Sequence, residues 1–401
     1  MSGIVIIGAG QAGSSLAIKL RALGYQGTVT LIGEEPYAPY QRPPLSKTYL
    51  LGEMALERLY LRPEEVYRDQ NIELRLGTQV TAIDPVAQVI SLGAETLSYD
   101  QLALTTGSTP RLLPEAIGGR LQNVFAVRGL ADVDAMRPAF ERGGHVLIIG
   151  GGYIGLEAAA VAAKRGLKVT LVEMADRILQ RVACAETSDY FRALHQSHGV
   201  TLLEGVGLSS LTGTDHVTGA ILSNGATLDI DFALVGVGIQ PNTQLADAAG
   251  LTLNNGIETN ALGQTSQSKI WAAGDCASFP YQGERIRLES VPNAIDQAEV
   301  VAANMLGAQK AYHATPWFWS DQYDVKLQIA GLNQGFENVV TRIGEAGRSH
   351  WYYKAGQVLA VDAMNDPRAY MVAKRLIEAG KTADPALVAD PGSDLKALLR
   401  G

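Results

Sequence analysis

The chain has 401 residues, 47% of them hydrophobic and 18% charged, which is an ordinary globular composition with room for about two to four domains. Its net charge is −8, whereas nonspecific nucleic-acid binding needs a basic surface, so we expect no nucleic-acid partner. The two cysteines, Cys184 and Cys276, form no C-x-x-C pair, which excludes a disulfide framework and a cysteine zinc site and fits a reducing compartment.

We expect neither a membrane-spanning helix in the sequence nor a signal peptide in its first residues. No segment is apolar over the ~20 residues that a transmembrane helix needs. Residues 1–8 lack a basic first part and a cleavage site, and their apolar run is short. We therefore expect a cytoplasmic protein with no membrane partner, and no motif predicts a bound metal.

The first predicted elements form a βαβ unit. A β-branched run at residues 4–7 predicts a buried strand, which leads into the loop Gly8-Ala9-Gly10-Gln11-Ala12-Gly13, a helix over 14–23 and a second strand over 28–32. The glycines allow a tight turn and close approach to a pyrophosphate, and the helix N-terminus supplies N–H donors. Glu34, just after the second strand, is placed to accept hydrogen bonds from ribose. The pattern predicts a dinucleotide site; the alternative is a glycine turn in an α/β sheet.

The same pattern recurs in mid-chain. A strand over 145–149 precedes the loop Gly150-Gly151-Gly152-Tyr153-Ile154-Gly155, a helix over 156–165 and a strand over 168–172. Glu173 ends that strand, where an acid accepts from the ribose 2′-OH of NADH and repels the 2′-phosphate of NADPH. Two such units imply two dinucleotides that exchange electrons. The alternative, a duplicated domain with one inactive site, finds no support, because no loop glycine is replaced.

The first loop is expected to hold FAD, because the N-terminal βαβ units of flavoproteins bind the ADP half of that cofactor. The rest of FAD needs contacts from distant segments, and residues 270–275 form a predicted strand that ends in Gly274-Asp275. The Asp275 carboxylate can bind the ribityl chain or the pyrophosphate region. A turn or a helix cap is the alternative role for this aspartate.

Together these residues resemble the two-dinucleotide-domain flavoproteins with the glutathione-reductase-like fold. The likeness includes a hinge motif at 103–110, which contains Thr106 and Gly107, and the segment 235–242. More closely, the chain is similar to the ferredoxin reductases of bacterial oxygenase systems. The motifs that carry this resemblance are Gln41 to Lys47 (QRPPLSK), Gly150 to Glu157 (GGGYIGLE), Glu289 to Ala294 (ESVPNA) and Pro316 to Tyr323 (PWFWSDQY).

The resemblance implies an α/β fold with two Rossmann-like dinucleotide-binding domains and a C-terminal α+β domain. The FAD-binding domain would be discontinuous, at 1–113 and 243–315, with the NADH-binding domain at 114–242 and the C-terminal domain at 316–401. Short strands are expected at 79–84 and 88–92 in the first of these domains. In the last domain we expect strands at 325–330, 339–341, 349–354 and 358–361, a helix at 369–379 and a loop at 385–392.

The resemblance also implies the site residues. Lys47 would lie near flavin N5 and pair with Glu157, and Trp319 would pack beside the isoalloxazine; taken alone, Lys47 is a surface lysine and Trp319 a core aromatic. The residues implied to contact FAD are Gly8, Gly10, Ala12, Gly13, Glu34, Arg42, Lys47, Val80, Thr106, Gly107, Arg128, Gly274, Asp275, Val291 and Trp319. Those implied for the NADH site are Gly150, Gly152, Ile154, Gly155, Glu173, Gly238 and Glu289. Near Glu173 in the sequence, Arg177 and Arg181 are expected to bind pyrophosphate or to face solvent; the alternative is contact with the 2′-phosphate of NADPH.

The segment from Tyr40 to Leu51 contains no cysteine, whereas disulfide reductases of this fold carry a C-x4-C relay there. Transfer through the flavin edge to a docked one-electron carrier is the consistent alternative. We expect an NADH-dependent FAD reductase, a monomer or weak homodimer, that passes single electrons to a [2Fe-2S] ferredoxin serving a haem monooxygenase or a ring-hydroxylating dioxygenase. The other possibilities are an NADH oxidase, a rubredoxin or quinone reductase, or a flavoprotein whose binding role is switched by NADH.

Overall fold

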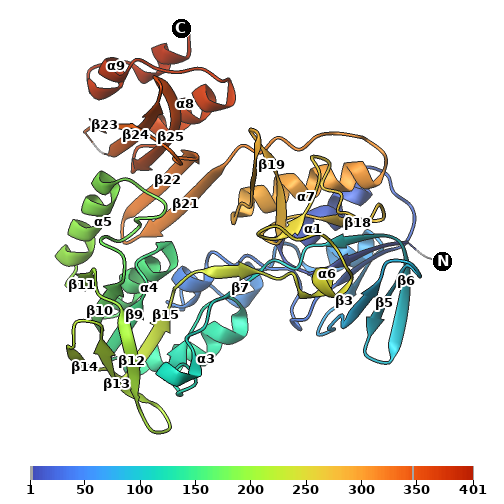
Figure 1. Ribbon diagram of the computed structural model, residues 1–401, viewed down its shortest axis with the longest axis horizontal. Helices are drawn as coiled ribbons and strands as arrows, with labels where there is room; N and C mark the ends of the chain where they lie inside the picture. Colours follow the sequence, from blue (N-terminus) through green and yellow to red (C-terminus); the bar gives the residue numbers. More distant parts are fainter. Residues whose placement is uncertain (1–2, 346, 401) are drawn as a thin grey trace. The chain divides into compact units, whose positions relative to one another are not determined.

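The computed structural model, shown in Figure 1, describes residues 3–345 and 347–400. Its chain divides into two compact units. Unit 1 consists of Met1–Arg42, Ala55–Thr109 and Ile239–Pro316. Unit 2 consists of Pro43–Met54, Pro110–Gly238 and Trp317–Gly401. Each unit therefore combines segments that are far apart in the sequence.

A seven-stranded sheet organises unit 1, in the order β3-β2-β1-β6-β5-β4 with β18 also paired to β6. Its strands are β1 (Gly3–Ile7), β2 (Val29–Ile32), β3 (Ile72–Arg75), β4 (Ala82–Asp84), β5 (Val89–Leu92), β6 (Glu95–Leu104) and β18 (Ile270–Ala272). The pairs made by β1, β2, β3 and β18 are parallel, and β4 and β5 extend the sheet as antiparallel strands. The predicted first strand is confirmed, and it is buried on both faces: Ile4 and Ile6 join one core cluster, Val5 and Ile7 the other.

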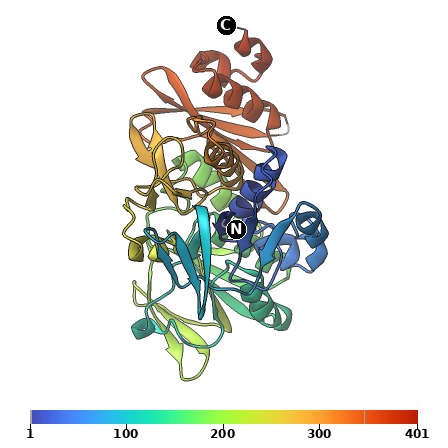
Figure 2. The same cartoon turned by 90° about the vertical axis from the view of Figure 1, so that its right-hand side faces the viewer.

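Two helices pack together on one face of this sheet. They are α1 (Gln11–Ala22), which follows the first glycine loop, and α7 (Val291–Met305), and Figure 2 shows them side by side in blue and orange-brown. Leu16 and Leu20 of α1 share a core cluster with Val301 of α7. The smaller elements of the unit are α2 (Glu64–Asp69), α6 (Gln244–Ala248), β7 (Ser108–Pro110) paired with β16 (Ile239–Pro241), and a three-stranded sheet of β17 (Ile257–Glu258), β19 (Ala277–Tyr281) and β20 (Glu284–Ile286).

Unit 2 contains a second parallel sheet, in the order β11-β10-β9-β15-β8. Its strands are β8 (Val124–Phe125), β9 (His145–Ile149), β10 (Lys168–Glu173), β11 (Thr201–Glu204) and β15 (Phe232–Val235). The helices are α3 (Leu130–Arg142), α4 (Tyr153–Lys164) and α5 (Ala185–Ser197), and an antiparallel sheet is formed by β12 (Leu208–Gly213), β13 (Val217–Leu222) and β14 (Thr227–Asp229). The order β9, glycine loop, α4, β10 confirms the second predicted βαβ unit.

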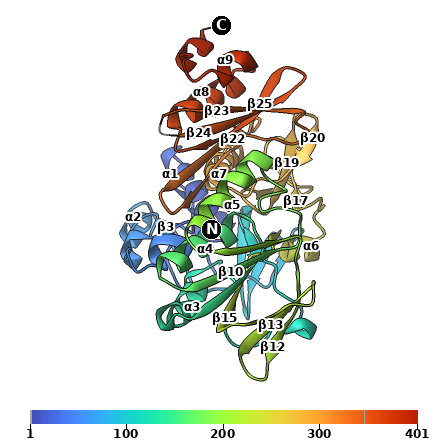
Figure 3. The ribbon, with the colours of Figure 1, turned by 90° about the vertical axis from the view of Figure 1, so that its left-hand side faces the viewer.

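The last part of unit 2 is an antiparallel sheet in the order β21-β22-β25-β24-β23. Its strands are β21 (Trp317–Gln322), β22 (Val325–Gly331), β23 (Asn338–Ile343), β24 (Arg348–Lys354) and β25 (Gln357–Met364). Helix α8 (Pro367–Glu378) packs against β22 and β25 (Figure 3). These elements confirm the four strands and the helix predicted for the tail, and β21 adds a strand to them.

The predicted loop at 385–392 is wrong in its first half, where the chain forms the helix α9 (Pro385–Ala389). The Asp384 carboxylate accepts a hydrogen bond from the Ala386 N–H, and Pro385 occupies the first helical position. Aspartate and proline are common in turns, but Asp followed by Pro, as in Asp384-Pro385, is also typical of the cap and first residue of a helix.

The division into units groups some segments differently from the expected domains. Residues 43–54, expected with the FAD-binding domain, belong to unit 2, where the short π-helical turn η1 (Leu45–Tyr49) packs on α4. The expected NADH-binding and C-terminal domains both lie in unit 2, apart from residues 239–242 and Pro316, which belong to unit 1. The three-domain division therefore stays a prediction. Among the described residues, no helix is long and apolar enough to cross a membrane.

Candidate functional site

The first glycine loop leaves open space at one of its three glycines. Gly8 has φ +113°, and a Cβ there would lie 2.2 Å from the Thr105 carbonyl oxygen. A Cβ at Gly13 would lie 2.0 Å from the Gly8 oxygen. Gly10, in contrast, has φ −93° and nothing within 4 Å of a Cβ. Its glycine is thus not required by the protein's own packing, and the space in front of α1 fits a pyrophosphate.

The second loop repeats this geometry. Gly150 has φ +110° and would place a Cβ 2.4 Å from the Gly236 oxygen, and a Cβ at Gly155 would lie 2.0 Å from the Gly150 oxygen. Gly152 has φ −81° and no atom within 4 Å of a Cβ. Both loops therefore fit the phosphates of a dinucleotide.

The acids that follow the two units are held differently. Glu173 Oε2 accepts from the Gly151 N–H at 2.7 Å, and its Oε1 accepts from the Ala175 N–H at 2.8 Å. These bonds fix the carboxylate beside the second loop and leave lone pairs for ribose hydroxyls. Glu34 is exposed, and its Oε1 accepts from Gln79 Nε2 at 3.3 Å.

Gly274, a further predicted FAD residue, lies directly against the first loop, and Asp275 follows it in the chain. Gly274 has φ +82°, and a Cβ there would be 3.0 Å from the Ala12 Cβ. Asp275 Oδ2 accepts from the Ser108 hydroxyl at 2.8 Å. The structure thus brings Ala12, Gly274 and Asp275 together near the carboxyl ends of β1 and β18, where ligands of open parallel sheets bind.

The remaining predicted FAD residues of unit 1 are placed by several elements. Arg42 Nη2 pairs with Glu35 Oε1 at 2.5 Å and its Nη1 donates to the Tyr40 hydroxyl at 3.0 Å. Burial lowers the pKa of Arg42, but Tyr40, Glu35 and Asp275 together raise it above its usual value, so the guanidinium stays charged. Val80 is buried and Val291 begins α7. Thr106 donates to the Asn242 oxygen at 2.7 Å, and Gly107 accepts from the Asn242 N–H.

Lys47 and Glu157 form an ion pair inside unit 2. Lys47 lies in η1, where it departs from helical geometry, and its Nζ is 2.9 Å from Glu157 Oε1 on α4. Ser320 of β21 donates to the same oxygen at 2.7 Å, and Ser46 donates to Oε2 at 3.0 Å. Burial raises the pKa of Glu157, while Lys47 and the two hydroxyls lower it. Three side chains therefore favour the ionised form of a carboxylate that is only 3% exposed.

Sequence reasoning missed Ser46 and Ser320. Each is adjacent to a residue that the resemblance singled out, Lys47 in one case and Trp319 in the other. Both serines also lie inside motifs that carry the resemblance, residues 41–47 and 316–323, but a serine in a strand or a helical turn carries no mark of its partner.

Trp319 lies on the other face of β21 from Ser320. Successive side chains of a strand point to opposite faces, so Phe318 shares the face of Ser320 and Trp319 does not. On that shared face, the ring of Phe318 packs on Tyr153 of α4 with centroids 4.9 Å apart. The Trp319 ring lies 5.6 Å from that of Trp317 and is partly exposed. The structure thus joins Lys47 with Glu157 but does not place the Trp319 ring on that pair.

The residues predicted for the NADH site divide between the units. Gly238 has φ +105°, and a Cβ there would be 3.9 Å from Arg181 Nη2, so these two residues are neighbours in unit 2. Ile154, in the second loop, is 46% exposed. Glu289 belongs to unit 1 and pairs with Arg287 at 2.5 Å. Arg128, predicted for FAD, lies in unit 2, where its N–H donates to Asp132 at the start of α3.

Comparison with known proteins decides the family. Residues 2–298 match the family described as pyridine nucleotide-disulphide oxidoreductase, and residues 317–399 match the reductase C-terminal domain. The chain belongs to the pyridine nucleotide-disulphide oxidoreductase family. Its sequence-based resemblance and fold class are confirmed, and this oxidoreductase is a flavoprotein of a family that uses FAD and NAD(P)H.

Several ferredoxin reductases are similar to this oxidoreductase over almost its whole length. It is 40% identical to putidaredoxin reductase of Pseudomonas putida, over 99% of this chain and 96% of that protein. It is 39% identical to the anthranilate 1,2-dioxygenase system ferredoxin–NAD(+) reductase component of Burkholderia cepacia, over 98% of both chains. The solved covalent putidaredoxin reductase–putidaredoxin complex matches with a TM-score of 0.95 and 39% identity, covering 100% of this chain and 98% of that chain.

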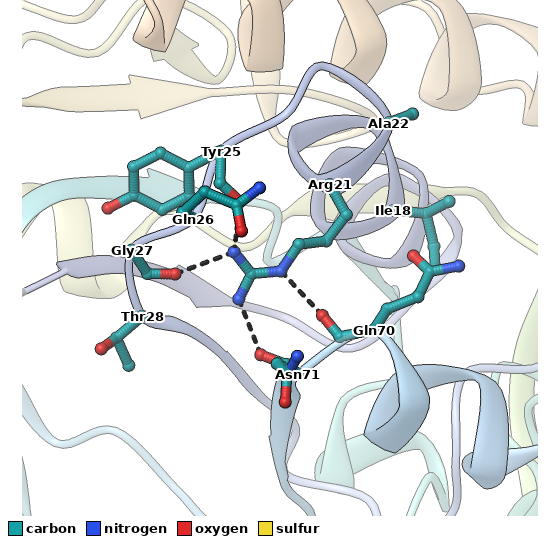
Figure 4. A pocket seen from close by; sticks show the side chains of 9 residues that line it. All are labelled: Ile18, Arg21, Ala22, Tyr25, Gln26, Gly27, Thr28, Gln70 and Asn71. Carbon is teal, nitrogen blue, oxygen red and sulfur yellow. Dashed lines mark hydrogen bonds between the residues drawn. The ribbon is translucent and has the colours of Figure 1, made fainter.

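The oxidoreductase also has a surface hollow of about 590 Å³ at the C-terminal end of α1 (Figure 4). Arg21 lies across it and donates to the backbone oxygens of Tyr25, Gly27, Gln70 and Asn71 at 2.6–2.8 Å. Its guanidinium is therefore used to join α1 to the segment after α2. The hollow lies at the opposite end of α1 from the glycine loop.

Neither cysteine of the oxidoreductase is placed for redox chemistry. Cys184 and Cys276 are free and buried, and burial raises the pKa of both thiols, which keeps them protonated. Within residues 3–345 and 347–400, no group of His, Cys, Asp or Glu side chains is arranged to hold a metal ion.

Proposed function

We propose that this protein is an NADH-dependent ferredoxin reductase that passes single electrons through FAD to a [2Fe-2S] ferredoxin serving a haem monooxygenase or a ring-hydroxylating dioxygenase. The observation that carries the proposal is 39–40% identity, over at least 98% of the chain, to reductases whose names specify putidaredoxin or the ferredoxin of an anthranilate dioxygenase system. Both glycine loops, the Lys47–Glu157 pair and the reductase C-terminal domain support it.

The FAD-binding role of unit 1 is supported by the first loop and by what surrounds it. Gly10 faces open space at the start of α1, so its backbone can approach a pyrophosphate. Asp275 follows Gly274, which contacts Ala12 of that loop, and supplies a carboxylate for hydroxyls of the cofactor. Arg42 supplies a permanent positive charge that is already oriented by Glu35 and Tyr40.

The NADH-binding role of the second loop is supported by Glu173. Its carboxylate is held by two backbone N–H groups, so it does not have to be ordered when the nucleotide binds. A fixed negative charge accepts from the 2′-OH of NADH and repels the extra phosphate of NADPH. Arg181 beside Gly238 can offset the pyrophosphate charge.

Lys47 is assigned to a position near flavin N5, and Glu157 is assigned to hold the Lys47 ammonium group there. When bound, FAD accepts a hydride and gives up the two electrons one at a time. The chain contributes an ammonium group whose position is fixed, since Glu157 holds it and is itself held by Ser46 and Ser320. A fixed positive charge stabilises negative charge better than a mobile one, because it needs no reorganisation. Trp319, partly exposed on β21, is assigned to pack beside the isoalloxazine.

The number and burial of the cysteines favour an electron acceptor outside the protein. Residues 43–54 contain no cysteine, and both cysteines of the chain are buried and protonated. Because no thiol can relay the electrons, a docked one-electron carrier is the proposed acceptor. Two buried free thiols also fit a reducing compartment, and we place the protein in the cytoplasm as a monomer or weak homodimer.

The test compares electron acceptors for the FAD-loaded protein. Supplied with NADH, it is expected to reduce a [2Fe-2S] ferredoxin of an oxygenase system much faster than dioxygen, a rubredoxin or a quinone, and NADPH should replace NADH poorly. Equal turnover with dioxygen alone would indicate an NADH oxidase. Faster reduction of rubredoxin or quinone would assign the protein to those reductases instead.

A further inference from the structure

A line of buried polar side chains continues outward from Glu157. Ser320 donates to Glu157 at 2.7 Å, and Gln322 Nε2 lies 3.2 Å from the Ser320 hydroxyl. Gln322 Oε1 lies 2.8 Å from His195 Nε2 on α5, and His195 Nδ1 lies 3.2 Å from the Tyr323 hydroxyl. Ser320, Gln322 and His195 are fully buried. Burying a polar group without a hydrogen bond costs free energy of folding. Here Ser320, Gln322 and His195 each have a partner, so the line is a satisfied network that can fix the orientation of its members.

The chemistry of these groups allows one set of proton positions when Glu157 is ionised. The carboxylate only accepts, so the single proton of Ser320 points at it, and the Ser320 oxygen must accept from Gln322. The amide NH2 of Gln322 then faces Ser320 and its oxygen faces His195. His195 must therefore carry its proton on Nε2 and accept from Tyr323 on Nδ1. Every hydrogen bond in the line is donated in the direction of Glu157.

We infer that Gln322 and His195 are positioning residues that keep the Ser320 hydroxyl donating to Glu157 and thereby hold the Lys47–Glu157 pair. Without the amide of Gln322, the Ser320 hydroxyl is free to rotate and the carboxylate loses a directed donor. The inference rests on the proposed function for the role of that pair in flavin chemistry. The line itself is a property of the protein alone.

The charges around the line agree with this direction. Lys47 is the charged group that acts on Glu157, and it favours the anion. Burial lowers the pKa of His195, the hydrogen bond with Gln322 opposes that shift and His198 adds to it, and the net pKa is about 4, so His195 is neutral at physiological pH. A neutral imidazole can donate from one nitrogen and accept at the other, as the line requires. Burial raises the pKa of Tyr323, which keeps its hydroxyl protonated as a donor.

One substitution reverses the line with little change in shape. Gln322→Glu replaces the amide donor by an acceptor, which draws the Ser320 proton away from Glu157. Ser320→Ala removes the direct donor. Gln322→Met removes both polar atoms of the side chain and serves if the glutamate variant does not fold. His195→Gln keeps an N–H that can donate to Gln322, whereas His195→Phe keeps none. The phenylalanine variant should therefore raise the Glu157 midpoint, and the glutamine variant should restore the wild-type value.

The experiment titrates Glu157 by the chemical shift of its 13Cδ atom, assigned by difference against Glu157→Gln, in protein with and without FAD. We expect Ser320→Ala and Gln322→Glu each to raise the midpoint by about one pH unit, a tenfold change in proton affinity. Combining Ser320→Ala with Gln322→Met should add little to the effect of Ser320→Ala, because neither change adds a charge and both act through one hydroxyl. The 15N spectrum of the wild-type ring should show His195 as the Nε2–H tautomer. In the FAD-loaded protein, the acid limb of flavin reduction by NADH should move with the Glu157 midpoint.

Two results would overturn the inference. The first is a Gln322→Glu or Gln322→Met variant that lowers the thermal midpoint but leaves the Glu157 titration unchanged, since the line would then be structural only. The second is a His195 ring protonated on Nδ1 and bare on Nε2. Neither result depends on electron transfer to ferredoxin, so the inference and the proposed function can fail separately.

Discussion

Lys47 Nζ lies 2.9 Å from Glu157 Oε1, and this ion pair is largely removed from water: the side chains are 16% and 4% exposed. The chain contains a second Lys–Glu pair of the same length, Lys164 with Glu53, whose side chains are 58% and 49% exposed. The two pairs share their chemistry and differ in burial. Exposed pairs contribute about 0–1 kcal/mol, whereas breaking a buried pair leaves an uncompensated charge.

We therefore expect Glu157→Gln to slow flavin reduction by NADH at least about tenfold, or roughly 1.4 kcal/mol of barrier, because the Lys47 ammonium loses its fixed position. Stopped-flow absorbance of the flavin measures this rate. The matched control, Glu53→Gln, should leave the rate unchanged and alter stability by less than about 0.5 kcal/mol. Equal rates in the two variants would show that burial of the first pair does not matter for the chemistry.

The middle glycines of the two loops give a second prediction. Gly10→Ala should fold normally, because its Cβ meets nothing and its φ is open to alanine, and should bind FAD at least about tenfold more weakly. Gly152→Ala should bind FAD as the wild type does but weaken NADH binding by a similar factor. Each variant is the control for the other. Calorimetric titration of the apoprotein with FAD and of the holoprotein with NADH tests both, and unaltered affinities would place the phosphates elsewhere.

A third prediction concerns nicotinamide preference. Glu173→Ala should lower kcat/KM for NADH by an amount equivalent to about 1.5–3 kcal/mol of transition-state stabilisation, the cost of losing a charge-assisted hydrogen bond. The difference between kcat/KM for NADH and for NADPH should become smaller. Glu173→Gln keeps an oxygen for a backbone N–H and separates the loss of charge from loosening of the loop. An unchanged kcat/KM for NADH in the alanine variant would contradict the assignment.

The cysteines supply a negative prediction. The double variant Cys184→Ser, Cys276→Ser should keep most of its ferredoxin reductase activity, because burial keeps both thiols protonated and neither has a second cysteine nearby in the sequence. Turnover by folded, flavin-loaded protein is the measurement. A loss of more than about tenfold, roughly 1.4 kcal/mol, would require a thiol step.

Asp362 gives a prediction about pH and stability. Its side chain is buried on β25, where the hydroxyls of Tyr352 and Thr187 both donate to Oδ2, and burial raises its pKa to about 6. A carboxyl with a raised pKa binds its proton more tightly in the folded state, so its contribution to stability falls as pH rises from about 4 to about 6.

Asp362→Asn removes that charge. The variant should match the wild type near pH 4 and be more stable above pH 6, by on the order of 1–3 kcal/mol. Apparent Tm values across this range measure the difference. Asp321→Asn makes the same change at an exposed position of β21 and should show no such divergence. A wild type that is more stable than Asp362→Asn at pH 8 would contradict the account.

The sequence predicted the two dinucleotide units closely because glycine spacing is a physical requirement. A Cβ at Gly8 or Gly155 would collide with backbone, so the pattern of these residues carries the geometry of the turn. The pairing of Lys47 with Glu157 came from the resemblance, and the structure shows the contact. Whether the predicted residues contact FAD and NADH stays a prediction.

The hydrogen-bond partners of other motif residues had no local signal. Ser46, Ser320 and Gln322 acquire their roles only when η1, α4 and β21 pack together, and no spacing within one element encodes that packing. The α9 helix was missed for a different reason, since Asp384-Pro385 favours both a turn and a helix start and burial of Val388 selects the helix.

In the proposed function, the two electrons of the NADH hydride leave the protein one at a time to a ferredoxin. The most direct measurement is an anaerobic titration of a [2Fe-2S] ferredoxin with NADH, in the presence of a small amount of the FAD-loaded protein. We expect each NADH to reduce two ferredoxin molecules in the presence of the FAD-loaded protein, and apoprotein to reduce none. Oxidation of NADH that leaves the ferredoxin oxidised, or that proceeds only when dioxygen is admitted and yields hydrogen peroxide, would contradict it.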